Sequence, residues 1–396
     1  MDVVVAIISS ASLFLVALIA AHFISKNKAF SFLQARTQRY GCIDGLRGYL
    51  ALAVFLHHFV ITWYWKVNGW WDRPPEVYFQ NAGRVGVALF FMITGFLFIS
   101  KVLRDAGKTD WLKLFESRFF RIVPLYFFAV VCISVIVFTA TNFQLNVSPY
   151  ELVKQYFKWA TFRGYEINGF EDTRLIIAAV DWTLKYEWFF YLSLPVISLF
   201  IINGKRLGGA CLSLLTILLY IFPITALGMN SIYLIVFTVG GISAYIIKQY
   251  PVDYAYFRKT WVSIIAVLAL CISILHPNTM SITHILCMSI FFVLVVCGND
   301  LFGLLSLRSS VLLGEISYSI YLLHGLVLYL IFSFFNFVDL SVLSLSEAFA
   351  LMPLIGGLVV VVSVLTFILV EKHGITFGRK YKVSQFLRAK IGYRRK

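Results

Sequence analysis

Two side chains with reactive or anion-binding chemistry, Arg47 and His58, lie at helical spacing in an apolar stretch. The residues between them, 48–57, include no Asp, Glu, Lys or Arg. On an α-helix this spacing is about three turns, so both side chains share one face, about 16 Å apart along the axis. His57 points about a quarter-turn away, and Asp44 lies one turn before Arg47. A buried neutral histidine can serve as a general base or as a nucleophile.

A structural interpretation of the same residues stays open. Arg47 can extend to the membrane surface, and His58 can form a hydrogen bond to a neighbouring helix. The same choice applies to Glu187, which follows Trp182 and Thr183 at the start of a hydrophobic segment. A carboxylate inside a membrane indicates a functional site by default. A salt bridge from Glu187 to Arg84 or Lys185 is the alternative.

Arg118 and Arg121 lie one helical turn apart, just before another hydrophobic segment. Their forked guanidinium groups match the geometry of a phosphate, and anchoring of the cytoplasmic helix end is the simpler alternative. Farther along the chain, Tyr318, Tyr321 and His324 recur every three residues and form one polar stripe on a helix. That stripe is either a hydrogen-bonding network between helices or a support for a reaction site.

The composition indicates that membrane-spanning helices position these side chains. Hydrophobic residues make up 60% of the 396 residues, charged residues make up 13%, and the mean hydropathy is +0.84. Such values exclude an ordinary soluble domain, and barrel strands would show short alternating segments. The sequence therefore predicts an all-α polytopic membrane protein with about eleven spans. These spans are 3–24, 46–65, 85–103, 122–140, 186–202, 208–222, 231–247, 261–275, 282–297, 312–335 and 346–370.

The net charge of +15 suits membrane topology better than nucleic-acid binding, because the basic residues fall mainly in loops and in the tail. With the N-terminus outside, most of the 34 Lys and Arg residues lie on the cytoplasmic side, as they do in membrane proteins. We therefore expect the C-terminus inside. The six cysteines are scattered without a Cys-x-x-Cys pair, so we expect neither a disulfide framework nor a metal site.

The same residues carry a family resemblance. Asp44-Gly45-Leu46-Arg47, ten further residues and His58 resemble the signature of the acyltransferase-3 family of integral-membrane O-acyltransferases. Five other stretches follow in the family's order, with Thr94 and Thr183 standing where serine is usual and His373 where proline is usual. They are Gly86–Gly95, Arg118–Pro124, Trp182–Glu187, Ser317–His324 and Glu371–His373, and the resemblance covers residues 41–371.

The resemblance implies a ten-helix acyltransferase core over 41–371. An additional N-terminal span with a basic linker would occupy 1–40, and a basic cytoplasmic tail would occupy 372–396. It also implies O-acetylation of cell-envelope glycans such as lipopolysaccharide, capsule or exopolysaccharide in a bacterial inner membrane. Acetyl-CoA or another acyl-CoA would be a co-substrate, with no permanently bound cofactor, and the acceptor would be a glycan or a lipid-linked saccharide.

The expected site residues follow from the motifs. His58 and Glu187 are the expected catalytic residues, and His58 would act as base or acyl carrier in its unprotonated form, which burial favours. Arg47, Arg118 and Arg121 would hold the donor's phosphates at the cytoplasmic face. The supporting residues are Asp44, Thr94, Trp182, Tyr318 and His324.

Two other functions remain open at this stage. A transporter of a glycan precursor or small metabolite would use the buried charges as a permeation path, although no inverted repeat is visible in the sequence. A non-catalytic assembly scaffold would leave the deep ionisable residues unexplained. Four tryptophans near 63–71 also have two interpretations: an interfacial belt or a stacking surface for a sugar ring.

Overall fold

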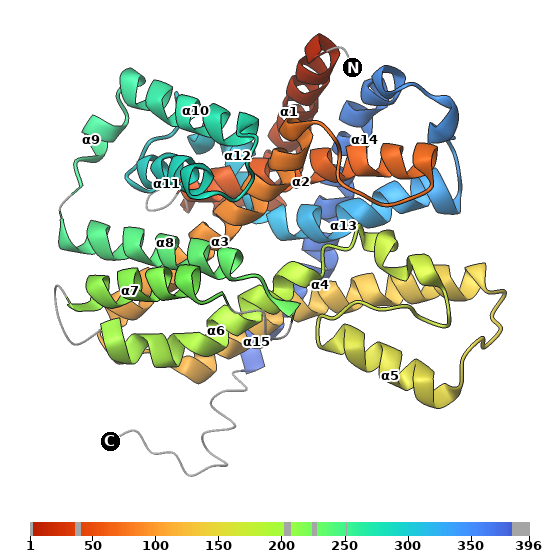
Figure 1. Cartoon of the computed structure of the whole chain (residues 1–396), viewed down its shortest axis with the longest axis horizontal. Helices are drawn as coiled ribbons and strands as arrows, with labels where there is room; N and C mark the ends of the chain where they lie inside the picture. Colours follow the sequence, from red (N-terminus) through yellow and green to blue (C-terminus); the bar gives the residue numbers. More distant parts are fainter. Residues whose placement is uncertain (1–2, 36–40, 202–206, 224–227, 251, 382–396) are drawn as a thin grey trace.

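The computed structural model describes residues 3–35, 41–201, 207–223, 228–250 and 252–381. Most of these residues are helical, and no sheet forms among them (Figure 1). The first half contains α1 (Val3–Ser25), η1 (Lys28–Ala35), α2 (Gly41–Asn68), α3 (Val77–Asp105), α4 (Trp111–Ala140), α5 (Pro149–Ala160), η2 (Glu171–Ile177) and α6 (Trp182–Ile201).

The second half adds α7 (Leu207–Ile221), α8 (Ser231–Gln249), α9 (Tyr254–Phe257), α10 (Thr260–Leu275) and α11 (Ile282–Val296). A break follows, and the chain continues through η4 (Leu304–Ser306), α12 (Arg308–Glu315), α13 (Ser317–Tyr329) and η5 (Leu330–Phe334). It ends with η6 (Leu340–Val342), α14 (Leu345–Thr366), η7 (Phe367–Glu371) and α15 (Lys372–Tyr381).

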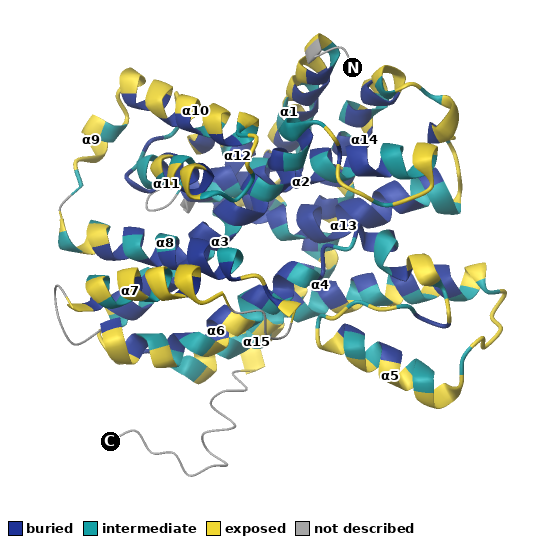
Figure 2. Cartoon of the chain, in the orientation of Figure 1, coloured by how far each residue is buried: buried dark blue, intermediate teal, exposed yellow. Residues whose placement is uncertain are grey.

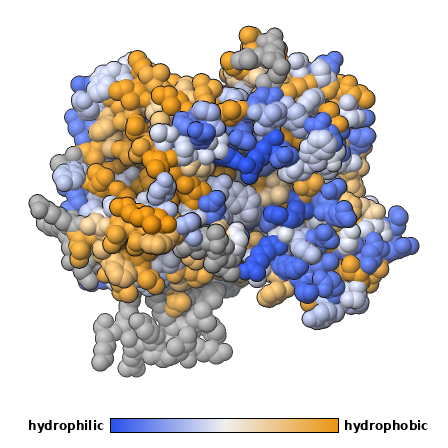
Figure 3. All heavy atoms as spheres, viewed as in Figure 1, coloured by the Kyte–Doolittle hydropathy of each residue, from blue (hydrophilic) through white to orange (hydrophobic). Residues whose placement is uncertain are grey.

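The described helices confirm the prediction of a polytopic membrane protein. Eight of them are long and apolar enough to cross a bilayer, and α7, α10 and α11 are shorter apolar helices. These eleven correspond in order to the eleven expected spans. Hydrophobic side chains dominate the surface over α7 and α10, as a lipid-facing surface requires (Figure 3).

Several helix boundaries differ from those expected from hydropathy. The helix carrying Arg47 already begins at Gly41, and α4 begins at Trp111, so Arg118 and Arg121 lie inside a helix and not before it. A hydropathy window ends a span at the first charges, whereas a helix continues where other helices surround those charges. The expected single span 312–335 is also divided, because α12 ends and α13 begins on either side of Ile316.

Helix α13 lies at the centre of the helical bundle. Nearly all of its side chains are buried, and it packs against α2, α4, α14 and η2 (Figure 2). The preceding helix, α12, lies so close to the start of α2 that a Cβ at Gly314 would overlap the backbone of Asp44. Glycine is therefore required at this contact, which fixes the end of α2 that carries Arg47.

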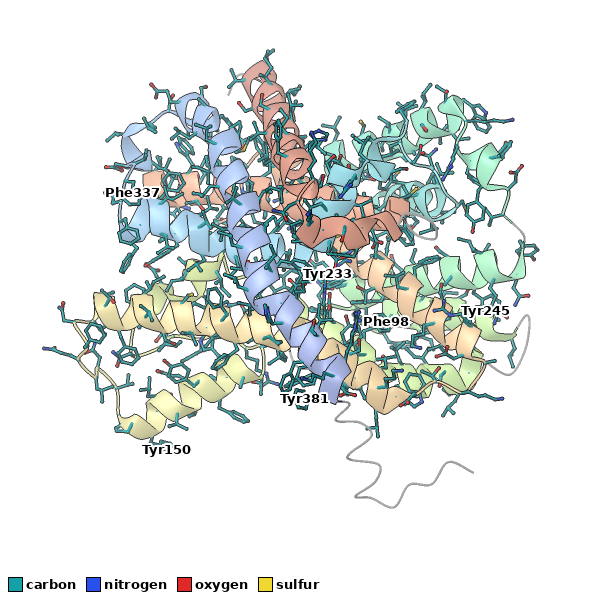
Figure 4. The ribbon with its side chains drawn as sticks, turned by 180° about the vertical axis from the view of Figure 1, so that it is seen from behind. Phe98, Tyr150, Tyr233, Tyr245, Phe337 and Tyr381 are labelled. Atoms are coloured by element: carbon teal, nitrogen blue, oxygen red, sulfur yellow. The ribbon has the colours of Figure 1, made fainter. Side chains whose placement is uncertain are left out.

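With the N-terminus outside, the residues 141–185 between two expected spans form an external loop, and the stretch 150–160 within it is amphipathic. A helix, α5, forms within it, and α5 and the second half of α4 project together from the rest of the molecule. Tyr150 lies at the start of α5 (Figure 4). The rest of the segment folds back, and Ile177 and Ala178 touch Gly325 of α13 so closely that a Cβ there would overlap them. The start of α6 is thereby brought into the helical bundle.

Asp181, just before α6, anchors the segment that folds back. Its carboxylate accepts hydrogen bonds from the backbone N–H of Gly164 at 2.8 Å and from Arg174 at 3.2 Å. Burial raises the pKa of Asp181, and the Arg174 charge and the two hydrogen bonds oppose that rise. The buried carboxyl is thus satisfied within its own loop and serves to hold η2 in place.

Candidate active site

A pair of histidines lies at the centre of the molecule. Nδ1 of His58 on α2 is 3.0 Å from Nε2 of His324 on α13, and the two rings are nearly parallel, with centroids 5.0 Å apart. His324 is completely buried, whereas His58 remains partly accessible. The structure thus brings together two expected site residues that are 266 positions apart in the sequence.

The hydrogen bonds of this pair determine where the protons lie when both rings are neutral. Nδ1 of His324 is 3.0 Å from the carbonyl oxygen of Ile320, which can only accept, so Nδ1 carries the proton. Nε2 of His324 is then the acceptor, and the Nδ1–H of His58 donates to it. This assignment leaves the lone pair of His58 on Nε2, where the ring can take a proton or attack an acyl carbon.

The polar stripe of α13 contacts three different helices. Tyr318 donates to the carbonyl of Ile122 on α4 at 2.9 Å, and the Tyr321 hydroxyl lies 3.0 Å from the hydroxyl of Thr183 on α6. His324 reaches α2 through His58. The stripe therefore forms a hydrogen-bonding network between helices, and its support of a reaction site stays a prediction.

A cluster of charges lies nearer the N-terminal end of α2. Arg47 is 3.9 Å from Asp44, so the expected pair forms at the limit of ion-pair distance. Arg118 lies over the ring of Phe98, 5.2 Å from its centroid, and interacts electrostatically with Glu187 and Arg47. Within the described part of the chain, no carboxylate oxygen lies within salt-bridge distance of Arg118.

Glu187 is not where its position in the sequence suggested. With the N-terminus outside, the expected span 186–202 starts at the outer side, opposite Arg118, but Glu187 and Arg118 both belong to this cluster. Two shifts explain the difference: α4 starts earlier than expected, and the returning segment places the start of α6 inside the bundle. Glu187 accepts a hydrogen bond from Tyr191 at 2.7 Å, and Lys185 donates instead to the Gly228 carbonyl.

Arg121 is already engaged with protein carboxylates. Its guanidinium is 2.8 Å from Glu371, whose side chain is fully buried, and 3.9 Å from Glu315. It also donates to the Glu315 carbonyl, and Ser319 donates to Glu371 at 2.9 Å. The π-helical turn η7 presents Glu371 to this pair. Arg121 therefore joins α4 to α12 and to the end of the α14 segment.

Trp182 and Thr94 are the remaining expected residues. Trp182 packs against Phe91, Tyr186 and Tyr233, and Thr94 is partly exposed on α3. The His57 ring meets His58 edge-on, with centroids 5.0 Å apart, but its Nδ1 is 2.9 Å from the Phe79 carbonyl and not from the histidine pair. Its ring lies beside Gly83, where a Cβ would come within 2.5 Å of it.

Three residues that contact the expected site residues were not predicted from the sequence. Tyr191 could have been found, because it lies one turn after Glu187 on the same helix face. The role of Glu371 as the counter-ion of Arg121 could have been suspected, since a carboxylate in an apolar segment requires a cation. The stacking of Trp71 on His58, with centroids 6.2 Å apart, had no local signal because Trp71 lies beyond the end of α2.

Comparisons with known proteins give a consistent result. The sequence model of a family described as an acyltransferase domain matches residues 40–370. Nodulation protein 10 of Rhizobium leguminosarum bv. viciae is 28% identical over 181 residues, which are 42% of this chain and 46% of that protein. A protein of Staphylococcus aureus strain COL, provisionally named an O-acetyltransferase, is 25% identical over 43% of this chain and 27% of its own length.

A third relative is matched over more of its length. A protein of Acidianus two-tailed virus, provisionally named an acetyltransferase, is 26% identical over 72% of this chain and 82% of its own length. The chain spans less than half of the rhizobial and staphylococcal proteins. No solved structure matches it.

Proposed function

The chain belongs to the family of this acyltransferase domain, and from that premise we propose that it is a membrane O-acyltransferase that uses an acyl-CoA donor. The observation that carries the proposal is the hydrogen bond between His58 and His324. It supports a neutral His58 with its reactive nitrogen free, deep in a helical bundle, as a general base or an acyl carrier requires. Arg47, three turns before His58 on α2, and Arg118 on α4 supply cations that support a phosphorylated donor.

The donor's phosphates bind near Arg47 and Arg118. Arg118 has no carboxylate at salt-bridge distance among the described residues, so its forked N–H groups can form charge-assisted hydrogen bonds to a phosphate. Arg121 was expected to do the same, but its ion pairs suit a positioning role that holds α4 beside the site. Glu187 and Tyr191 orient Arg118 electrostatically, which replaces the catalytic role expected for Glu187.

The pantetheine arm of the donor extends along α2 and brings the thioester to His58, about 16 Å beyond Arg47 by helix rise. In one route, Nε2 of His58 removes the proton from the acceptor hydroxyl as its oxygen attacks the thioester carbon. The carbon–sulfur bond then breaks, and the thiolate takes the proton from the His58 imidazolium. His324 accepts a hydrogen bond from Nδ1 throughout and stabilises the charged ring.

In the second route, Nε2 of His58 attacks the thioester carbon itself. The thiolate leaves, and the acyl-imidazole is then cleaved by the acceptor hydroxyl, whose proton goes to the thiolate or to water. Both routes use the same nitrogen. Capture of a labelled acyl group on His58 after rapid denaturation in acid would distinguish the second route from the first.

The acceptor is a glycan hydroxyl of the cell envelope, and the transferred group is acetyl. The names of the staphylococcal and viral relatives support an acetyl group. A membrane enzyme with its donor site at one end of α2 and its reactive histidine at mid-helix can receive an acceptor from the other side. The charge bias of the loops supports an N-terminus outside the cell and a C-terminus inside.

Acetyl-ester content tests this proposal in cells. Envelope glycans are purified from cells that have the protein, from cells that lack it, and from cells that carry His58→Ala at equal protein levels. We expect the acetyl esters to disappear in both altered strains. Unchanged acetyl esters after loss of the protein would contradict the proposal, as would full restoration by His58→Ala.

A further inference from the structure

An arginine that the proposed reaction does not use, Arg84, lies close to the reactive histidine. It belongs to α3, about two turns from the start of that helix, and the preceding residue, Gly83, lies against the ring of His57. The His57 ring in turn meets the His58 ring edge-on, with centroids 5.0 Å apart. Arg84 is therefore level with the histidines, whereas Arg47 lies about three turns away along α2.

Arg84 has no counter-ion in the described part of the chain. No ion pair and no hydrogen bond involves its guanidinium there, and Glu187, considered above as its partner, belongs instead to the cluster around Arg118. None of its nitrogen atoms is both buried and unpartnered, so the guanidinium reaches accessible space. The internal residues outside the described ranges contain no Asp or Glu; they are 36–40, 202–206, 224–227 and 251. A cation within a membrane-spanning helix is costly unless an anion balances it.

The groups around Arg84 do not supply that anion. Arg73, an exposed residue of the turn between α2 and α3, interacts electrostatically with Arg84 as a second cation. Both arginines also interact with His57 of α2 and with Tyr233 of α8, and Arg84 interacts with His284 of α11. None of these neighbours is a carboxylate, so the two positive charges repel each other without compensation from this cluster.

Tyr233 adds a hydroxyl group to this cluster. Its ring is held by Trp182 and Tyr186, whose centroids are 4.9 Å and 5.5 Å from its own. Within the described ranges its hydroxyl makes no hydrogen bond, and the oxygen is not among the buried unpartnered atoms, so it is accessible as well. Two guanidinium groups and a hydroxyl are the kind of donors that bind a phosphate or a carboxylate.

We propose that Arg84 and Arg73 bind an anionic group of the acceptor, a phosphate or a carboxylate, while a hydroxyl of the same molecule lies at His58. This inference rests on the proposed function, because it assigns a charge to the acceptor of that reaction. The acceptor is then an anionic saccharide and not a neutral one. Donor and acceptor do not compete for a cation, since the donor's phosphates bind near Arg47 and Arg118.

The test compares acceptors that differ in charge. The full-length protein is placed in phosphatidylcholine nanodiscs with acetyl-CoA, and the acceptor probes are methyl glucoside, methyl glucuronoside, glucose 1-phosphate and the three corresponding galactose compounds. We expect KM for the anionic probes to be roughly tenfold lower than KM for the neutral probe of the same sugar. A higher salt concentration should reduce this difference, because salt screens charges that are accessible to solvent.

Variants assign the preference to the arginines. Arg84→Gln should bring the ratio of neutral to anionic KM close to one, and Arg84→Lys should keep part of the ratio, since the charge remains and the fork is lost. Arg73→Gln should lower the ratio less, because Arg73 is exposed to solvent. Arg104→Gln is the matched control, since Arg104 is an exposed arginine near the other end of the same helix. Coenzyme A affinity should be equal in all four variants.

Equal KM values for neutral and anionic probes in the wild type would overturn the inference, as would an unchanged ratio in Arg84→Gln. So would wild-type protein that binds coenzyme A but acetylates none of the probes. Retention of labelled phosphatidylglycerol by the purified wild type and not by Arg84→Gln, without a preference among the probes, would assign the arginines to a lipid headgroup instead. Absence of coenzyme A binding to the wild type would contradict the proposed function and not this inference alone.

Discussion

At the residue scale, the proposed chemistry depends on the lone pair on Nε2 of His58. Nδ1 of His58 faces Nε2 of His324, and Nδ1 of His324 faces a carbonyl, so the two contacts together expose Nε2 of His58. His324 therefore acts through His58 and is a positioning residue. Spacing along α2 predicted His58 without its partner, because residues 266 positions apart come together only through tertiary packing.

The first prediction concerns His324. His324→Ala should lower kcat by roughly a hundredfold or more, because His58 loses the acceptor that fixes its tautomer, while KM for acetyl-CoA stays near the wild-type value. His324→Gln should recover part of kcat, because its side-chain oxygen can accept from Nδ1–H. Steady-state kinetics with Tyr318→Phe as the control would check this, since that change removes a different hydrogen bond of the same stripe. An equal loss of kcat in all three variants would indicate a merely structural role.

The second prediction concerns Arg118. Arg118→Ala should raise the dissociation constant for coenzyme A by roughly tenfold to a hundredfold, the value of one or two charge-assisted hydrogen bonds to a phosphate. Arg118→Lys should recover part of the affinity, since the charge remains and the fork is lost. Calorimetry in detergent measures this directly. Arg104→Ala is the control, because Arg104 is exposed near the end of α3. Equal affinities of wild type and Arg118→Ala would remove Arg118 from the donor site.

At the element scale, buried ion pairs hold together the helices that carry the site. Arg121 on α4 forms an ion pair with Glu371 of η7 at 2.8 Å. Ser319 of α13 donates a hydrogen bond to the same carboxylate. Removing one partner of such a pair leaves an uncompensated buried charge, whereas removing both can be nearly neutral. The pair thus keeps α4, and with it Arg118, beside α2.

The third prediction follows from this pair. Glu371→Ala should destabilise the protein by about 3–5 kcal/mol, and Arg121→Met/Glu371→Leu should recover most of that loss. Glu151→Ala, which breaks the exposed pair with Lys154, should have little effect. The midpoint of thermal unfolding in one detergent would rank the four proteins. If the double variant were as unstable as Glu371→Ala, the pair would contribute more than charge compensation.

The helices show which features of the fold could be predicted from the sequence and which could not. Hydropathy predicted the number and order of the apolar helices, because burial in lipid depends on local composition. It misplaced the start of α4, because charges compensated by distant helices look like loop residues, and it joined α12 and α13 into one span although the structure divides them at Ile316. Glu187 was misplaced for the same reason: the return of residues 161–181 to α13 depends on a close approach at Gly325, which no local pattern reports.

At the scale of the whole molecule, α13 lies in the interior and packs against α2, α4, α14 and η2. Arg47 and Arg118 lie toward the N-terminal end of α2, so the proposed donor would approach His58 from that end. The family model matches residues 40–370, and the expected domain limits, 1–40, 41–371 and 372–396, stay a prediction. The tail beyond Tyr381 lies outside the described residues.

The fourth prediction concerns orientation. In a protein whose six cysteines are replaced by alanine, Asp72→Cys should react with a membrane-impermeant thiol reagent in intact cells. Lys108→Cys should react only after the cells are permeabilised, because it follows α3 on the cytoplasmic side of the proposed topology. Both positions are exposed in the turns that flank α3. Labelling of Lys108→Cys alone in intact cells would reverse the orientation and place the donor arginines outside.

Transfer of a labelled acetyl group by the purified protein tests the central claim most directly. Wild type, His58→Ala and His57→Ala are placed in lipid nanodiscs with radiolabelled acetyl-CoA and a glycan acceptor, and alkali-labile label on the glycan is counted. We expect transfer by the wild type, none above background by His58→Ala, and substantial transfer by His57→Ala, because His57 faces the Phe79 carbonyl. Transfer by His58→Ala at the wild-type rate would contradict the account.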